Sequence, residues 1–73
     1  MNVDNLVTMA NQIGSFYETM PDRNKALADI TNHIKNFWEP RMRRALLAHI
    51  DAESETELSP VVLEAIQLHR SLL

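Results

Sequence analysis

The sequence contains no cysteine and only one glycine among its 73 residues, and each shortage excludes a class of protein. Without cysteine there are no disulfides, no thiolate metal ligands and no thiol nucleophiles, which fits the reducing cytosol. With a single glycine there is no glycine-rich loop to cradle a phosphate and little material for hairpin turns. We therefore expect neither a disulfide-stapled nor a hairpin-built protein.

Basic residues and long apolar runs are also scarce. Seven Lys and Arg against ten Asp and Glu give a net charge of −3, whereas a broad nucleic-acid-binding face needs a surplus of cations. No apolar run approaches the roughly 20 residues that span a bilayer, and residues 1–5 lack the features of a secretory signal. We expect a soluble, cytoplasmic protein that binds neither nucleic acid nor membrane.

Apolar residues recur throughout the chain at the three- and four-residue spacing of amphipathic helices. The pattern predicts one all-α domain over residues 1–73, a compact bundle of four short helices at about residues 4–20, 22–38, 40–52 and 60–72. Pro21 is expected to end the first helix, and Glu39-Pro40 to form the corner between the second and third, because proline disfavours the α conformation in the residue before it. Asp22 and Asn24 are the expected capping residues of the second helix, and Ser59 is the expected N-cap of the fourth.

The first and second helices are expected to share a core. The apolar stripe of the first comprises Leu6, Met9, Ala10, Ile13, Phe16, Tyr17 and Met20, and that of the second Leu27, Ile30, Ile34, Phe37 and Trp38. Gly14 lies in mid-helix, where glycine costs about 1 kcal/mol relative to alanine. We therefore expect another backbone, of this chain or of a partner, to pass close to the Ala10 and Gly14 side of this helix. Asn11 and Gln12 lie beside the stripe, and their amides either face solvent or bind the backbone of a partner.

No arrangement of residues predicts catalysis. The three histidines lie far apart in sequence, and none has a second ligand at metal-binding spacing. We expect His49 and His69 to pack on apolar stripes, and His33 to pair with Asp29. The serines lack a glycine-flanked elbow, and the carboxylates of residues 51–57 stand in a polar connector that does not raise a pKa. We expect no catalytic, cofactor-binding or metal-binding residue.

An arginine-rich segment breaks the local rules of helix formation. Arg41, Arg43 and Arg44 crowd the first turn of the third helix, where the helix dipole disfavours cations. Glu39 can pair with Arg43, whereas Arg41 and Arg44 have no acid three or four positions away. Two explanations stay open. Either these arginines fold back on the acidic connector, or they bind a partner protein, for which arginine beside aromatic residues is typical.

If a partner protein binds, we expect its contacts to come from the corner between the second and third helices and from the polar edge of the first. The candidate residues are Trp38, Arg41, Met42, Arg43, Arg44, Leu47, Asn11 and Gln12. Leu47 is expected to be an exposed apolar neighbour of the arginines. Phe37 and Trp38 continue the stripe of the second helix, which favours a core position for both.

A family resemblance lies in three blocks: MANQIGSFY at residues 9–17, HIKNFWEPRMRRALLAHI at 33–50 and LSPVVLEAI at 58–66. These blocks resemble the delta subunit of cytosolic NAD-dependent formate dehydrogenases of the molybdenum or tungsten type. The middle block is distinctive, because helix amphipathicity alone would not generate Phe-Trp, an acid and Pro-Arg-Met-Arg. Two features depart from the family pattern: Glu39 stands where Asp is usual, and the connector at residues 51–57 is acidic rather than glycine-rich.

The resemblance implies a non-catalytic accessory subunit that binds the large catalytic subunit and stabilises it or helps to assemble it. In such a complex the catalytic subunit carries a molybdopterin metal centre and iron–sulfur clusters, other subunits carry FMN and iron–sulfur centres for NAD reduction, and the delta chain supplies no ligand. In isolation the same surface can form a homodimer. The alternative function is a small helical nucleic-acid-binding or adaptor protein.

Overall fold

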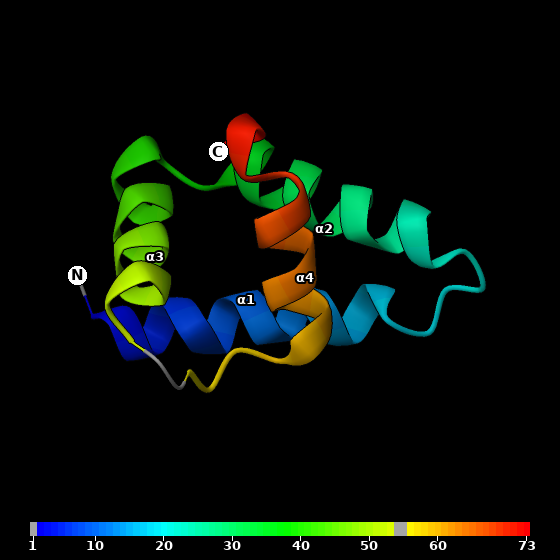
Figure 1. The fold of residues 1–73 in the computed structure, drawn as a ribbon, viewed down its shortest axis with the longest axis horizontal. Helices are drawn as coiled ribbons and strands as arrows, with labels where there is room; N and C mark the ends of the chain where they lie inside the picture. Colours follow the sequence, from blue (N-terminus) through cyan, green and yellow to red (C-terminus); the bar gives the residue numbers. More distant parts are fainter. Residues whose placement is uncertain (1, 54–55) are drawn as a thin grey trace.

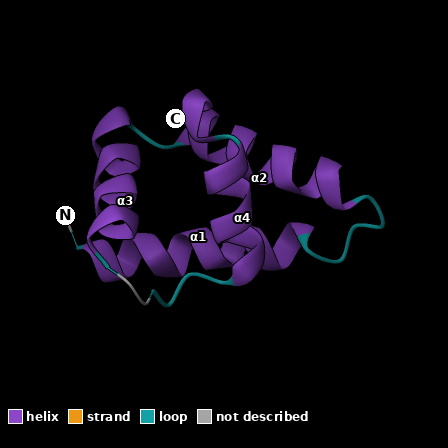
Figure 2. Ribbon diagram, in the orientation of Figure 1, coloured by secondary structure: helices purple, strands orange, loops and turns teal. Residues whose placement is uncertain are grey.

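The computed structural model describes residues 2–53 and 56–73 of the chain. These residues form the helices α1 (Val3–Tyr17), α2 (Arg23–Phe37), α3 (Pro40–Ala52) and α4 (Pro60–Leu68), followed by a 3-10 helix, η1 (Arg70–Leu72). Figure 2 shows that helices and loops make up the whole described part of the chain, without a strand. The predicted all-α fold is confirmed.

Side-chain caps start the first two helices. The Asn2 side chain accepts a hydrogen bond of 2.8 Å from the backbone N–H of Asp4. The Asp22 carboxylate accepts one of 3.1 Å from the N–H of Lys25, as predicted. Each bond satisfies one of the N–H groups that a helix start leaves without an internal partner. Asn24, the other expected cap of α2, lies inside the helix instead. Ser59 holds the predicted N-cap position of α4, but its hydroxyl makes no capping hydrogen bond.

Proline and extended backbone set the other helix boundaries. Both α3 and α4 begin with proline at their first position, where the missing N–H costs nothing. The first helix ends at Tyr17, several residues before Pro21, so proline follows the helix rather than ending it. The last helix ends at Leu68, and the chain tightens into η1 instead of continuing as α-helix. None of the described helices is both long and apolar enough to cross a membrane.

The helices pack as crossed pairs in a body of 33 × 24 × 19 Å. Figure 1 shows α1 along the bottom of the molecule, with α3 and α4 standing across it and α2 behind α4. The closest packing joins α2 to α4, and α1 contacts each of the other three helices. The helix α1 is therefore the element on which the rest of the bundle is assembled.

The core lies where α1, α2 and α4 meet. Its buried residues are Leu6, Val7, Ala10, Ala26, Leu27, Ile30, Ile34, Trp38, Leu46, Leu58, Val61, Val62, Ala65 and Ile66. The helix α3 contributes only Leu46 to this set. Among residues 2–53 and 56–73, Thr31 is the buried polar residue. Its hydroxyl donates to the carbonyls of Leu27 and Ala65, which ties α2 to α4.

A segment of this chain does pass close to Gly14, but its side chains rather than its backbone make the approach. A Cβ atom on Gly14 would lie 2.5 Å from Cγ2 of Val62, in the first turn of α4, and 3.2 Å from Oγ of Ser59, the N-cap residue before it. The neighbouring atoms belong to side chains rather than to backbone. Glycine is required here because any side chain on α1 would push α4 away from it.

Part of the expected apolar stripe lies outside the core. The buried face of α1 comprises Leu6, Val7, Ala10 and Gly14. Phe16 is 76% exposed and Met9 39% exposed, so the expectation that both pack inside is wrong. They lie on the edge of the stripe, because α1 turns its other edge toward α4.

Candidate functional site

The arginine-rich corner, which we define as residues 37–44, joins α2 to α3. The backbone N–H of Trp38 still bonds to the carbonyl of Ile34, at 3.0 Å, but Trp38 itself and Glu39 adopt extended conformations. Pro40 then begins α3. The helix ends at Phe37, and the extended backbone at Trp38 changes the direction of the chain. The side chains of these two neighbouring aromatic residues therefore point to different sides.

Phe37 and Trp38 therefore have opposite environments. Trp38 is 6% exposed and belongs to the core, as predicted. Phe37 is 74% exposed, so its expected core position is wrong. Its ring lies against that of His33, with centroids 4.8 Å apart. The helical spacing suggested one face for both residues, but Trp38 lies past the end of α2 and no longer follows that spacing.

Arg43 binds within its own chain. Its Nη1 donates a long hydrogen bond, 3.4 Å, to the carbonyl oxygen of Lys35 in the last turn of α2. The Arg43 Nε is buried and has no hydrogen-bond partner among the described residues. The pairing expected between the side chains of Arg43 and Glu39 is not formed. Arg43 thus links α3 to the C-terminal end of α2, where carbonyl groups attract a cation.

Arg41 and Arg44 are exposed on α3. The ion pairs formed among residues 2–53 and 56–73 are Arg23 with Glu64, Lys25 with Asp29, and Arg70 with Asp51. None of them uses Arg41 or Arg44. Neither arginine therefore pairs with a described residue of the acidic connector. Ser54 and Glu55 of that connector lie outside the described residues.

The connector's first acid pairs elsewhere. The two oxygens of Asp51 accept hydrogen bonds of 2.9 and 2.7 Å from the guanidinium of Arg70 in η1. The hydrogen bond from Arg70 lowers the pKa of Asp51. The same hydrogen bond to Asp51 raises the pKa of Arg70. Asp51 is thereby held to the C-terminal turn rather than to the arginines of α3.

The other candidates on α3 face inward. Met42 and Leu47 are half-buried and pack against the core. The expectation that Leu47 is an exposed apolar group beside the arginines is therefore wrong. A helix that buries one stripe against α1 has Leu47 on the margin of that stripe, so little of its side chain remains for a partner.

Asn11 holds the connector to α1. Its amide nitrogen donates to the carbonyl oxygen of Glu57 at 2.9 Å, and its amide oxygen accepts from the N–H of Ser59 at 2.8 Å. A backbone segment is therefore bound by Asn11, but it belongs to this chain. Gln12 is exposed beside it. A partner-binding role for the two residues stays a prediction, and the structure gives the Asn11 amide a role in the fold.

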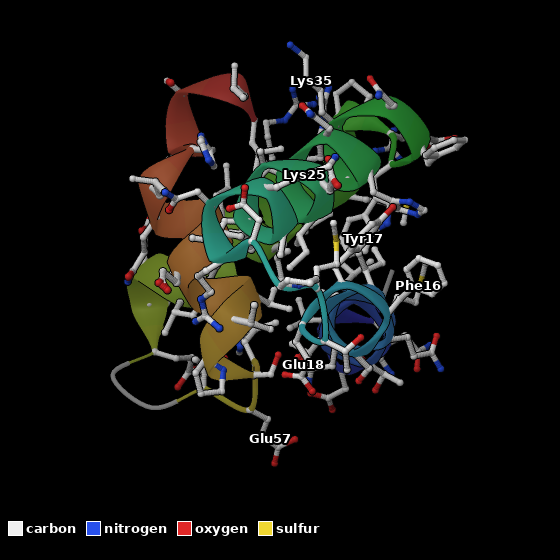
Figure 3. The ribbon with its side chains drawn as sticks, turned by 90° about the vertical axis from the view of Figure 1, so that its right-hand side faces the viewer. Phe16, Tyr17, Glu18, Lys25, Lys35 and Glu57 are labelled. Carbon is white, nitrogen blue, oxygen red and sulfur yellow. The ribbon has the colours of Figure 1, made fainter. Side chains whose placement is uncertain are left out.

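An open hollow of about 490 Å³ lies between α1 and α2, and sequence reasoning missed it. We call it the aromatic hollow, and its lining comprises Met9, Gln12, Ile13, Phe16, Tyr17, His33 and Trp38. The rings of Phe16 and Tyr17 meet edge to face at 5.0 Å. In Figure 3, Phe16 extends away from the body of the protein, whereas Tyr17 lies between α1 and α2.

The sequence does hold a signal for this surface. Residues 5–17 include no Asp, Glu, Lys, Arg or His, although charged residues make up 23% of the chain. The residues of this stretch that face solvent are Asn5, Thr8, Met9, Gln12, Ser15 and Phe16. An exposed helix face without charge is unusual, because such faces normally carry the solubilising residues.

The three histidines do not form a common site. Each is half-buried, and His49 lies 3.1 Å from the hydroxyl of Thr56. The pairing of His33 with Asp29 is not formed, since Asp29 pairs with Lys25. The described residues hold no cluster of three or more His, Cys, Asp or Glu that could bind a metal ion. That the chain binds no cofactor stays a prediction.

The fold, the arginine-rich corner and the aromatic hollow define a small helical protein. Its exposed surface includes an uncharged face of α1 on which Met9 and Phe16 stand among polar residues. Depletion of charge is typical of the core of protein–protein interfaces. A family model described as the NADH-dependent formate dehydrogenase delta subunit, FdsD, matches residues 5–66. The chain belongs to this family, so the resemblance seen in its sequence is confirmed. No curated protein sequence and no solved structure gives a significant match.

Proposed function

We propose that this chain is a non-catalytic accessory subunit of a cytosolic NAD-dependent formate dehydrogenase, and that it binds the large catalytic subunit. The observation that carries the proposal is the family match over residues 5–66, since that family is named as a subunit of this enzyme. Binding stabilises the catalytic subunit or helps it to assemble.

Two exposed arginines support the binding role. Arg41 and Arg44 form no ion pair with any described residue. Arg41 also lies in the first turn of α3, where the helix dipole disfavours a cation. Carboxylates of a partner would remove this cost. A guanidinium offers a planar, two-pronged donor that matches a carboxylate, and it loses less conformational entropy per hydrogen bond than a lysine.

Stabilisation of the catalytic subunit follows from mass action. A chain that binds only the folded form of its partner favours that form by RT ln(1 + [L]/Kd), about 2.7 kcal/mol when its free concentration is a hundred times Kd. An effect of this size is a large fraction of the stability of a typical protein. No chemistry by the accessory chain is needed for it.

We also propose that the cofactors of the complex are held by its other subunits. These are the molybdopterin metal centre, the iron–sulfur clusters, FMN and the bound NAD. Iron–sulfur clusters are ligated mainly by cysteine, which this sequence lacks. The chain then affects cofactor content only through the folding or assembly of the subunit that it contacts.

Co-expression tests the proposal. The catalytic subunit is produced with and without this chain, and its yield, its molybdenum or tungsten and iron content and its rate of formate oxidation are measured. We expect the two chains to purify together, with higher yield or metal content when both are present. If the catalytic subunit does not retain the chain and gains nothing from it, the proposal is wrong.

A further inference from the structure

We propose that the aromatic hollow is the docking site for an amphipathic helix of the large catalytic subunit, one with an uncharged apolar ridge and carboxylates near one end. The inference rests on the proposed function, because it assigns the surface through which that partner is bound. It differs from the sequence-based expectation, which placed the contacts mainly at the arginines.

The hollow is bordered by apolar surface that no other part of the described chain covers. Phe16 and Phe37, which we call the apolar rim, are 76% and 74% exposed. Phe16 lines the hollow, and Phe37 packs on its lining residue His33. Since an aromatic side chain buries about 150 to 250 Å², these two present roughly 200 to 400 Å² to solvent. A stable interface buries about 800 Å² per partner. The hollow and its rim are therefore the right size for the central part of an interface.

The shape of the hollow suits a convex element such as a helix. A volume of about 490 Å³ that is open to solvent admits several side chains from a convex element. Five of the lining residues belong to α1, His33 belongs to α2 and Trp38 follows the end of α2, so the hollow lies where α1 meets the C-terminal part of α2. Helix-in-groove recognition uses this arrangement, with apolar anchors at three- and four-residue spacing on the bound helix.

The part of the hollow formed by α1 carries no charge. The α1 side of the hollow lies in the stretch without a charged residue, residues 5–17. The fully buried centre of an interface is depleted of charge and enriched in Phe, Tyr and Met, and here Met9, Phe16 and Tyr17 provide such groups. A partner helix therefore meets this wall with uncharged side chains.

The arginine-rich corner includes Trp38, which lines the hollow, and its charges indicate the other feature of the partner. Arg41 follows Trp38 by three residues, so their Cα atoms are at most about 11 Å apart. The corner holds Arg41, Arg43 and Arg44 against the single acid Glu39, in a chain of net charge −3. Carboxylates near one end of the docked helix would meet Arg41 or Arg44, which form no ion pair among the described residues.

The same charges disfavour a second copy of this chain as the occupant. In a two-fold dimer the same patch contributes from both copies. Two hollows would face each other, and two arginine-rich corners would be brought to one interface, where like charges repel. A heterologous helix with acidic residues avoids both problems.

Binding measurements on exposed positions test the assignment. The double variant Phe16→Ser/Phe37→Ser removes the apolar rim, while Leu68→Ser on α4, also a largely exposed apolar residue at 60%, serves as the matched control. Circular dichroism checks that each variant is folded. We expect the double variant to bind the catalytic subunit at least about tenfold more weakly and the control to bind like the wild type.

Site-specific cross-linking identifies the occupant. Because the chain has no cysteine, Gln12→Cys provides a unique attachment point for a photo-cross-linker at the hollow, and Leu68→Cys provides one away from it. Within the assembled complex, we expect the Gln12→Cys probe to label one helical segment of the catalytic subunit and the control probe not to label it.

The outcomes separate the two levels of the argument. If the wild-type chain does not bind the catalytic subunit, the proposed function is wrong and the docking assignment fails with it. If the wild type binds but the Phe16→Ser/Phe37→Ser variant binds equally well, only the docking assignment is wrong. Cross-links from Gln12→Cys to a second copy of this chain would also overturn it.

Discussion

Gly14 lies where α1 meets the first turn of α4, and its lack of a side chain sets the distance between these helices. In Gly14→Ala the added Cβ would approach Val62 Cγ2 to 2.5 Å unless α4 moves. Overpacking of this kind costs about 1 to 3 kcal/mol, and the better helix propensity of alanine returns roughly 1 kcal/mol. We expect a net loss of about 1 kcal/mol in the free energy of unfolding, measured by urea denaturation.

A second substitution shows whether the contact with Val62 is the cause. Val62→Ala removes the Cγ2 atom and, being in the core, destabilises the protein by itself. If the two sites share one crowded contact, Gly14→Ala/Val62→Ala should be more stable than the sum of the single changes predicts. Strict additivity would show that the cost at Gly14 has another origin.

The amide of Asn11 is expected to be a stabilising group of the fold. Asn11→Ala loses two hydrogen bonds, to Glu57 and Ser59, and leaves the half-buried N–H of Ser59 without its acceptor. Such a loss costs about 1 to 3 kcal/mol. Gln12→Ala, at the exposed neighbouring position, should change stability by less than about 0.5 kcal/mol. Equal thermal unfolding of the two variants would contradict the role given to Asn11.

At the scale of elements, the pair formed by Asp51 and Arg70 links the end of α3 to η1. Because the hydrogen bond from Arg70 lowers the pKa of Asp51 below its ordinary value of 3.8, the pair stabilises the folded chain above that value. The contribution disappears as the pH falls through the lowered pKa and the carboxylate is protonated. Both groups are exposed, so salt should weaken the effect.

This pair predicts a pH-dependent difference between two proteins. Asp51→Asn keeps the size of the side chain but does not titrate. We expect the wild type to have the higher Tm at neutral pH, and the difference to vanish in strong acid and shrink at high salt, as followed by circular dichroism. A difference that persists unchanged in strong acid would mean that the ion pair is not its source.

The elements themselves are largely predictable, because local chemistry decides them. Asp22 caps α2, proline begins α3 and α4, and the unexpected Gly14 in mid-helix correctly predicted a close approach. These signals act over a few residues. Trp38, the largest apolar group of its stripe, is also where the sequence placed it, in the core.

The errors fall where a contact between distant segments decides the outcome. Phe16 and Met9 have core-like spacing, but which edge of α1 is covered depends on where α4 packs. The helical spacing predicts a core position for both Phe37 and Trp38, whereas α2 ends at Phe37 and only Trp38 is buried. The partner of Asp51 is Arg70, nineteen positions away, which no local rule predicts.

At the scale of the whole molecule, the distribution of surface groups fits a subunit of a larger assembly. A chain of 73 residues buries only about 60% of the surface that it exposes when unfolded. In this protein Phe16 and Phe37 are largely exposed, and Arg41 and Arg44 form no ion pair among the described residues. The uncharged face of α1 and the basic corner lie on neighbouring elements, so one partner can cover both.

Charge reversal at the corner should weaken binding without affecting the fold. Arg44→Glu replaces an exposed cation, and Arg23→Glu makes the same change in net charge at another exposed position, where Arg23 pairs with Glu64. Exposed ion pairs contribute little to stability, so both variants should remain folded. Only Arg44→Glu is expected to weaken the complex, by about tenfold or more.

The equilibrium dissociation constant for the purified catalytic subunit tests the central claim most directly. Measured by biolayer interferometry near physiological salt, the wild-type chain should bind saturably, Arg23→Glu should bind with nearly the same constant, and Arg44→Glu should bind at least about tenfold more weakly. Absence of saturable binding by the wild-type chain would contradict the assignment of this protein as an accessory subunit that grips its catalytic partner.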